Sequence, residues 1–133
     1  MMKKILPTVK KKILVVDDEP NILTAISDLL LAKGYDVVTA QDGEEGVARS
    51  KDSKPDLILL DIMMPKLSGI ELLKQLKSSD KAAHIPIIIL SAKSDLDTLN
   101  EAMWNYADKY ITKPYNPDEL LTSIRSTIEL SYT

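Results

Sequence analysis

The stretch that decides the fold is residues 12–19, Lys-Ile-Leu-Val-Val-Asp-Asp-Glu, in which an unbroken apolar run ends directly on three acidic residues. A run that is apolar on both faces is typical of a strand buried in the middle of a parallel sheet. Pro20 then suits the first turn of a helix, and Gly34 suits its end. We therefore predict a buried strand, an acidic turn and an amphipathic helix.

The same unit recurs along the chain. Four further segments have the composition of strands, and each is followed by a helical pattern. The strands are predicted at 35–40, 57–60, 87–90 and 109–111, and the helices at about 44–51, from 69, at about 95–105 and from 117. Strands that alternate with helices form right-handed βαβ units. The expected fold class is α/β: a doubly wound (βα)5, flavodoxin-like fold with a five-stranded parallel sheet and helices on both faces.

Length and composition limit the possible functions. The chain has 133 residues, enough for one domain, and its 17 Lys and Arg against 20 Asp and Glu give a net charge of −3. This balance argues against a strongly basic nucleic-acid binder, and the 44% hydrophobic content argues against disorder. No apolar run approaches the roughly 18 residues of a transmembrane helix, and no signal peptide is evident. Because cysteine is also absent, we expect a cytoplasmic protein without disulfides.

Chemically active residues follow the strands at the edge where open parallel sheets bind ligands. They are Asp17 and Asp18 after the first strand, Asp61 after the third, Ser91 after the fourth and Lys113 after the fifth. Converging carboxylates repel one another unless a cation is present, and an oxygen-only ligand set favours Mg²⁺. A metal, a lysine, a hydroxyl group and a carboxylate together suit phosphoryl transfer, with Asp61 as the candidate nucleophile.

Four segments resemble the receiver domain of two-component response regulators. They are residues 13–20 (ILVVDDEP), 55–65 (PDLILLDIMMP), 90–93 (LSAK) and 110–114 (YITKP). Each segment is a weak signal alone, but all four occur in order and at strand ends. The resemblance covers about residues 11–130, so we expect a receiver domain there, a flexible N-terminal extension at 1–10 and a C-terminal tail at 131–133.

The resemblance implies a role for the residues at the strand ends. Asp61 would accept the phosphoryl group, and Lys113 would offset its charge. Asp18 would bind Mg²⁺ directly and Asp17 through water. The backbone carbonyl of Met63 would be a further metal ligand.

The resemblance also implies how phosphorylation changes the surface. Ser91 would turn toward the phosphoryl group, and Tyr110 would rotate into the space that it leaves. The face formed by the fourth helix, the fifth strand and the fifth helix would change with them and control a downstream effector protein. The chain departs from the family at Tyr106, where Gly is usual, and we predict that Trp104 and Tyr106 line this partner face.

A partner histidine kinase or phosphotransfer protein would supply the phosphoryl group, because the only histidine, His84, is predicted in a loop away from the strand ends. The chain would then be a signalling domain rather than an enzyme, catalysing only its own phosphorylation and dephosphorylation. It would neither contact nucleic acid directly nor insert into a membrane. Met63 and Lys93 flank the phosphoryl position without an acid or carboxamide to orient water, which predicts slow hydrolysis.

Other functions share parts of this pattern. Taken alone, the acidic pair is equally typical of a cap on the next helix. A flavodoxin-like nucleotide or flavin binder has the same architecture, but usually cradles phosphate with Gly, Ser and Thr where this chain has Asp17 and Asp18. A phosphatase with an aspartyl nucleophile would need a second acid at Met63. A receiver-like scaffold that is not phosphorylated is a further alternative. It is disfavoured because this chain has every residue type that the phosphorylation site requires.

Overall fold

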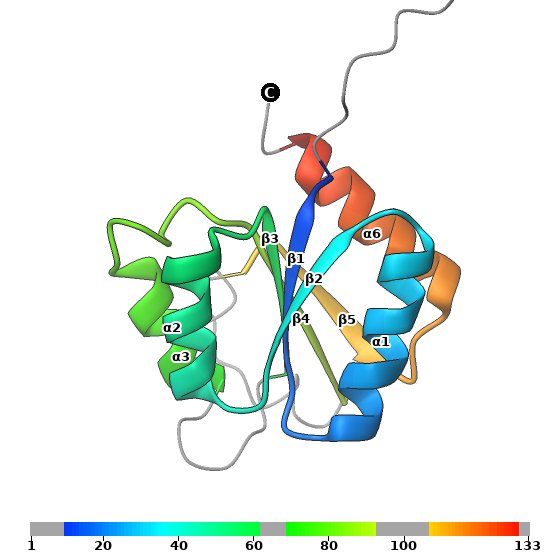
Figure 1. Cartoon of the computed structure of the whole chain (residues 1–133), viewed down its shortest axis with the longest axis horizontal. Helices are drawn as coiled ribbons and strands as arrows, with labels where there is room; N and C mark the ends of the chain where they lie inside the picture. The colour runs from blue at the N-terminus through cyan, green and yellow to red at the C-terminus, as the bar shows by residue number, and fades with distance from the viewer. Residues whose placement is uncertain (1–9, 62–68, 93–106, 131–133) are drawn as a thin grey trace, which may run out of the picture.

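A five-stranded parallel sheet forms the centre of the protein (Figure 1). The computed structural model describes residues 10–61, 69–92 and 107–130. The strands lie in the order β2-β1-β3-β4-β5, and each neighbouring pair is parallel. Their bounds are Lys12–Val16 for β1, Asp36–Ala40 for β2, Leu57–Leu60 for β3, Ile87–Ala92 for β4 and Lys109–Lys113 for β5. The predicted sheet is therefore confirmed.

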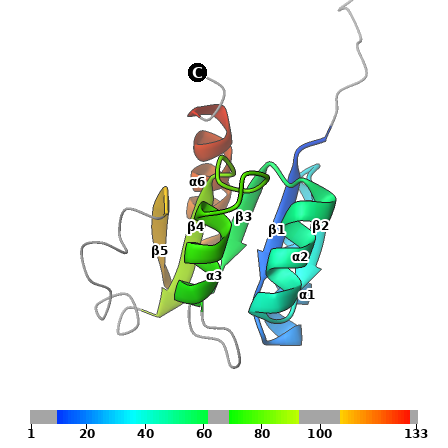
Figure 2. The same ribbon diagram turned by 90° about the vertical axis from the view of Figure 1, so that its left-hand side faces the viewer.

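Helices cover both faces of the sheet. The described residues include α1 (Pro20–Ala32), α2 (Gly43–Ser53), α3 (Gly69–Lys77) and α6 (Pro117–Leu130). α1 and α6 lie on one face, and α2 and α3 lie on the other (Figure 1). Figure 2 shows α2 and α3 in front of the strands. The helix predicted at about 95–105 falls outside the described residues, and no described helix is long and apolar enough to cross a membrane.

Alternate residues of the strands supply two separate hydrophobic cores. Leu14 and Ile58 pack toward α2 and α3, where they meet Leu72. Ile13 and Leu59 pack toward the opposite face and its helices α1 and α6. All these side chains are fully buried, so the strands must be apolar on both faces. This explains the unbroken apolar runs in the sequence.

Two strands extend further than predicted, which changes how site residues are held. β4 continues to Ala92 and β5 to Lys113, so Ser91 and Lys113 belong to strands rather than following them. The register pairs Ser91 with Thr112 and Ala92 with Lys113. The predicted ends at 90 and 111 were wrong because backbone pairing between β4 and β5 continues past the apolar run. Both side chains are thus held by a paired backbone.

The strand order reverses between β1 and β3. The connection after β1 leads outward to β2, whereas the connection after β2 returns to β3 on the other side of β1. The carboxyl ends of these central strands lie at the lower edge of the sheet in Figure 1. Ligands of open parallel sheets bind at such a switch point.

Candidate functional site

Three carboxylates meet at the carboxyl ends of the two central strands. Asp17 and Asp18 follow β1, and Asp61 follows β3. One carboxylate oxygen from each residue lies within 4.8 Å of the others. The backbone N–H of Asp61 donates to the carbonyl of Val16 at 3.0 Å, which fixes the two strand ends side by side. The structure therefore brings together the acidic residues that the sequence placed at strand ends.

Asp17 is the most enclosed of the three acids. Its side chain is 4% exposed, and its Oδ1 accepts a hydrogen bond from the backbone N–H of Glu19 at 3.0 Å. Burial raises the pKa of Asp17, and the charge of Asp61 acts in the same direction, against the Glu19 hydrogen bond and Lys113. The site thus holds an anion where ionisation is unfavourable, and a nearby cation would offset that cost.

Capping of α1 does not explain the acidic turn. Glu19 occupies the position before the first helical residue, and its side chain makes no capping hydrogen bond. The side chain of Asp17 instead closes a turn on the Glu19 N–H. Sequence reasoning missed this contact, although an Asp two residues before the N-cap position of a helix is typical of such a turn.

Lys113 and Ser91 complete the cluster from β5 and β4. Lys113 Nζ lies 3.1 Å from Asp61 Oδ2 and 3.4 Å from Asp17 Oδ2. Burial acts to lower the pKa of Lys113, but the charges of Asp61 and then Asp17 outweigh it and raise this pKa, so the amine stays protonated. Ser91 is 1% exposed, and its Oγ donates to Asp61 Oδ1 at 3.2 Å. Asp61 is therefore held from both sides by donors.

The donor set fits a hard divalent cation. One ammonium group faces three carboxylates, so the cluster keeps a net negative charge when all are ionised. The grouped side chains offer only carboxylate oxygens, which are the ligands that Mg²⁺ prefers. Asp17, Asp18 and Asp61 could hold such an ion.

Tyr110 lies on the same face of the sheet as Ser91. The register pairs Tyr110 with Ile89, two residues before Ser91, and residues two apart on a strand share a face. Tyr110 is half-buried and packs against the core below α2 and α3; burial raises its pKa. Ser91 Oγ already points at Asp61, and the movements predicted for Ser91 and Tyr110 stay predictions.

The remaining predicted residues are not part of this geometry. Met63, Lys93, Trp104 and Tyr106 fall outside the described residues, and the predictions made for them stay predictions. His84 is exposed in the segment before β4, at the other edge of the sheet from the acidic cluster.

The sequence is similar to those of known response regulators. It matches the family model of the response regulator receiver domain over residues 13–125. The chain is 44% identical over 91% of its length to the alkaline phosphatase synthesis transcriptional regulatory protein PhoP of Bacillus subtilis, covering 50% of that protein. It is 42% identical over 90% of its length to the phosphate regulon transcriptional regulatory protein PhoB of Pseudomonas aeruginosa, covering 52%. The chain thus spans about half the length of these relatives.

Solved structures agree with this match. A response regulator receiver domain protein from Clostridium thermocellum has a TM-score of 0.83 and 35% identity, covering 92% of this chain and 97% of its own. The receiver domain of a sensor histidine kinase from Pseudomonas aeruginosa has a TM-score of 0.82 and 28% identity, covering 91% and 99%. It is described with a magnesium ion coordinated in the active site cleft. The chain belongs to the response regulator receiver domain family of two-component signalling systems.

Proposed function

We propose that this receiver domain accepts a phosphoryl group on Asp61 from a phosphohistidine of a partner kinase or phosphotransfer protein. The observation that carries the proposal is the setting of the Asp61 carboxylate. Lys113 Nζ and Ser91 Oγ contact its two oxygens at 3.1 Å and 3.2 Å, and two further carboxylates lie beside it. Asp17 is less well placed as an acceptor, because its Oδ1 is committed to the Glu19 turn.

The transfer itself is a displacement at phosphorus. One carboxylate oxygen of Asp61 forms a bond to phosphorus while the phosphorus–nitrogen bond of the phosphohistidine breaks, and the histidine nitrogen keeps the electron pair. Lys113 pairs with the phosphoryl oxygens as their charge develops. The Ser91 hydroxyl donates a hydrogen bond to the same group. These residues position and neutralise the group rather than act as acids or bases.

The proposal includes Mg²⁺ as the cofactor. The residues that would hold it are Asp17, Asp18 and Asp61, and the resemblance adds the backbone carbonyl of Met63. When bound there, the ion would supply positive charge to offset the carboxylates and the incoming phosphoryl oxygens. The oxygen-only donor set and the related receiver domain described with magnesium support this assignment.

Phosphorylation then works as a switch on a partner. The new dianion draws the Ser91 hydroxyl, and Tyr110 on the same face of the sheet responds to the space that changes around it. The surface affected includes Trp104 and Tyr106 and contacts a downstream effector. If a Trp104→Ala protein is still phosphorylated and binds its effector as before, this surface is wrongly assigned. The proposal also places these events in the cytoplasm, as the family resemblance implies.

Acetyl phosphate tests the acceptor assignment without a cognate kinase. The purified chain is incubated with acetyl phosphate and Mg²⁺, and its intact mass is measured. We expect the added mass of one phosphoryl group in the wild type and in Asp28→Asn, which removes an exposed acid on α1. Asp61→Asn should gain none. An unmodified wild type, or equal labelling of Asp61→Asn, would refute the proposal.

A further inference from the structure

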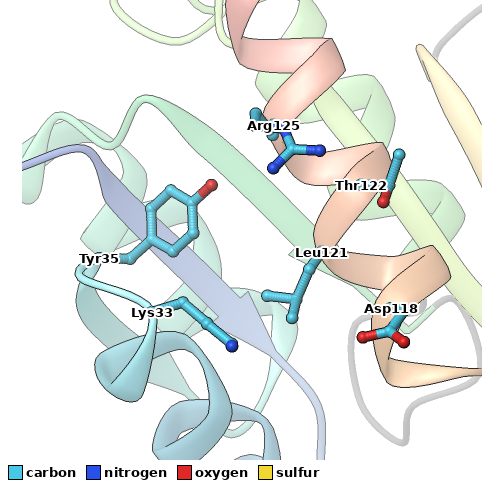
Figure 3. A pocket seen from close by; sticks show the side chains of 6 residues that line it. All are labelled: Lys33, Tyr35, Asp118, Leu121, Thr122 and Arg125. Carbon is cyan, nitrogen blue, oxygen red and sulfur yellow. The ribbon is translucent and has the colours of Figure 1, made fainter.

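A pocket separate from the acidic cluster lies between the α1–β2 connection and α6 (Figure 3). Its volume is about 400 Å³, within the range of small-molecule sites. The lining residues are Lys33, Tyr35, Asp118, Leu121, Thr122 and Arg125. None of them has a part in the proposed phosphoryl transfer.

The floor of the pocket is apolar. The ring of Tyr35 and the side chain of Leu121 are half-buried, and both pack against the core below α1 and α6. These two side chains come from different elements, so the floor spans the junction between the start of β2 and the α6 helix. An aromatic ring of this kind accepts a planar apolar group by stacking.

Two unpaired cations stand at the rim. In Figure 3 the guanidinium of Arg125 and the hydroxyl of Tyr35 point toward each other, and the Lys33 side chain extends toward Leu121. In the part of the chain that the structure describes, neither the Lys33 ammonium nor the Arg125 guanidinium makes an ion pair or a hydrogen bond. Both therefore remain available to a ligand.

The charges give the pocket a direction. Arg125 and Asp118 are seven residues apart on α6, which is about 10 Å along a helix. An anionic group is therefore attracted toward Arg125 and repelled from Asp118 along α6, and Lys33 adds a positive charge from the opposite side of the pocket (Figure 3). The planar guanidinium suits bidentate contacts to phosphate, and the hydroxyls of Tyr35 and Thr122 add further donors.

We propose that this pocket binds a phosphate monoester that carries a planar apolar group. The phosphate lies between Lys33 and Arg125, and the apolar group lies against Tyr35 and Leu121. A phosphate offers more oxygens to these donors than a carboxylate does. The site is independent of Asp61 and of the proposed phosphoryl transfer.

Phenyl phosphate is a suitable probe, because this ester is not an acyl phosphate and should not phosphorylate Asp61. It is titrated into ¹⁵N-labelled protein with EDTA present, and backbone amide shifts are followed by NMR. We expect the largest shifts at Lys33, Tyr35, Leu121 and Arg125. Inorganic phosphate should bind more weakly than phenyl phosphate, because it leaves the apolar floor uncovered.

Matched variants identify the cations. Arg125→Gln and Lys33→Gln should each weaken phenyl phosphate binding by roughly tenfold, as expected for a lost charge-assisted contact. Lys81→Gln, in a second pocket lined by Lys51 and Lys54, should leave the affinity unchanged. Unchanged affinity in Arg125→Gln, shifts centred on Lys81 or Lys113, or equal binding of inorganic and phenyl phosphate would each overturn the proposal.

Discussion

Replacing Asp17 with asparagine should stabilise the metal-free domain and remove its response to Mg²⁺. The amide oxygen of asparagine can still accept the Glu19 N–H that Asp17 Oδ1 accepts at 3.0 Å. The substitution therefore keeps the turn and removes only the charge. This separates the electrostatic contribution of Asp17 from its structural one.

The magnitude follows from burial of the charge and not from the charge pairs alone. The lost repulsion from Asp61, within 4.8 Å, amounts to about 3.5 kcal/mol at an effective dielectric constant near 20. The lost attraction to Lys113 at 3.4 Å is about 5 kcal/mol on the same scale, so these two pairs alone would favour the wild type. Burial of the charged carboxylate is the largest cause of the raised pKa of Asp17 and outweighs this difference. Because one pKa unit corresponds to about 1.4 kcal/mol, we expect a net gain of roughly 1 kcal/mol.

The pH dependence of stability also predicts that the charge on Asp17 destabilises the folded protein at neutral pH. Burial raises the pKa of Asp17 in the folded state, so the folded protein binds this proton more tightly than the unfolded chain does. The resulting stability is present below the ordinary pKa of 3.8 and is lost as pH rises through the folded-state value. The advantage of Asp17→Asn over the wild type should therefore be large at neutral pH and disappear in acid.

Thermal unfolding followed by circular dichroism measures this effect. In EDTA at neutral pH, Asp17→Asn should raise Tm by about 4 °C. Adding Mg²⁺ should raise Tm of the wild type but not of the variant, since a ligand stabilises only the state that binds it. Asp28→Asn, at an exposed site on α1, should resemble the wild type in both conditions. A variant no more stable than the wild type in EDTA, or an equal Mg²⁺ response in both, would refute the reasoning.

Three further predictions concern transfer, stability and lifetime. Lys113→Gln should slow labelling by acetyl phosphate about a hundredfold, because it removes the cation 3.1 Å from Asp61 Oδ2; a rate within a factor of two would contradict this. Asn116→Ala should lower the free energy of unfolding, measured in urea, by about 1 kcal/mol. The reason is that Asn116 Oδ1 accepts hydrogen bonds from the N–H groups of Asp118 and Glu119 at the start of α6. Asn116→Ser keeps a capping oxygen and should retain most of the wild-type stability. The phosphorylated protein should decay slowly, since neither Met63 nor Lys93 can orient attacking water; an intact-mass time course with a half-life of seconds in Mg²⁺ would disprove this.

Much of the fold is readable in the sequence because the strands are apolar on both faces. Residues 57–60 and 87–90 have no polar alternation, and this pattern identifies the buried middle of a parallel sheet. Asn116 is of a residue type that favours the position before a helix, and its side chain does cap α6. The ends of β4 and β5 were not readable in this way, since Ser91 and Lys113 are polar residues whose backbones still pair with a neighbouring strand.

The candidate site was predictable in its membership but not in its internal geometry. Parallel strands share one carboxyl edge, so acids that follow β1 and β3 must meet there. The burial of Asp17 depends on long-range contacts such as its backbone N–H bond to the Ala40 carbonyl at 3.1 Å. Which oxygen of Asp61 faces Ser91 and which faces Lys113 depends on the register of four strands. Neither the burial of Asp17 nor the orientation of the Asp61 oxygens can be predicted from the neighbouring residues in the sequence.

The central claim is that Asp61 carries the phosphoryl group, and chemical trapping tests it at the level of the residue. After reaction with acetyl phosphate and Mg²⁺, the protein is treated with borohydride, which reduces an aspartyl phosphate to homoserine, and its peptides are analysed by mass spectrometry. The account predicts homoserine at position 61 alone. Homoserine at position 17 or 18, or at no position in a protein that has gained phosphoryl mass, would contradict it.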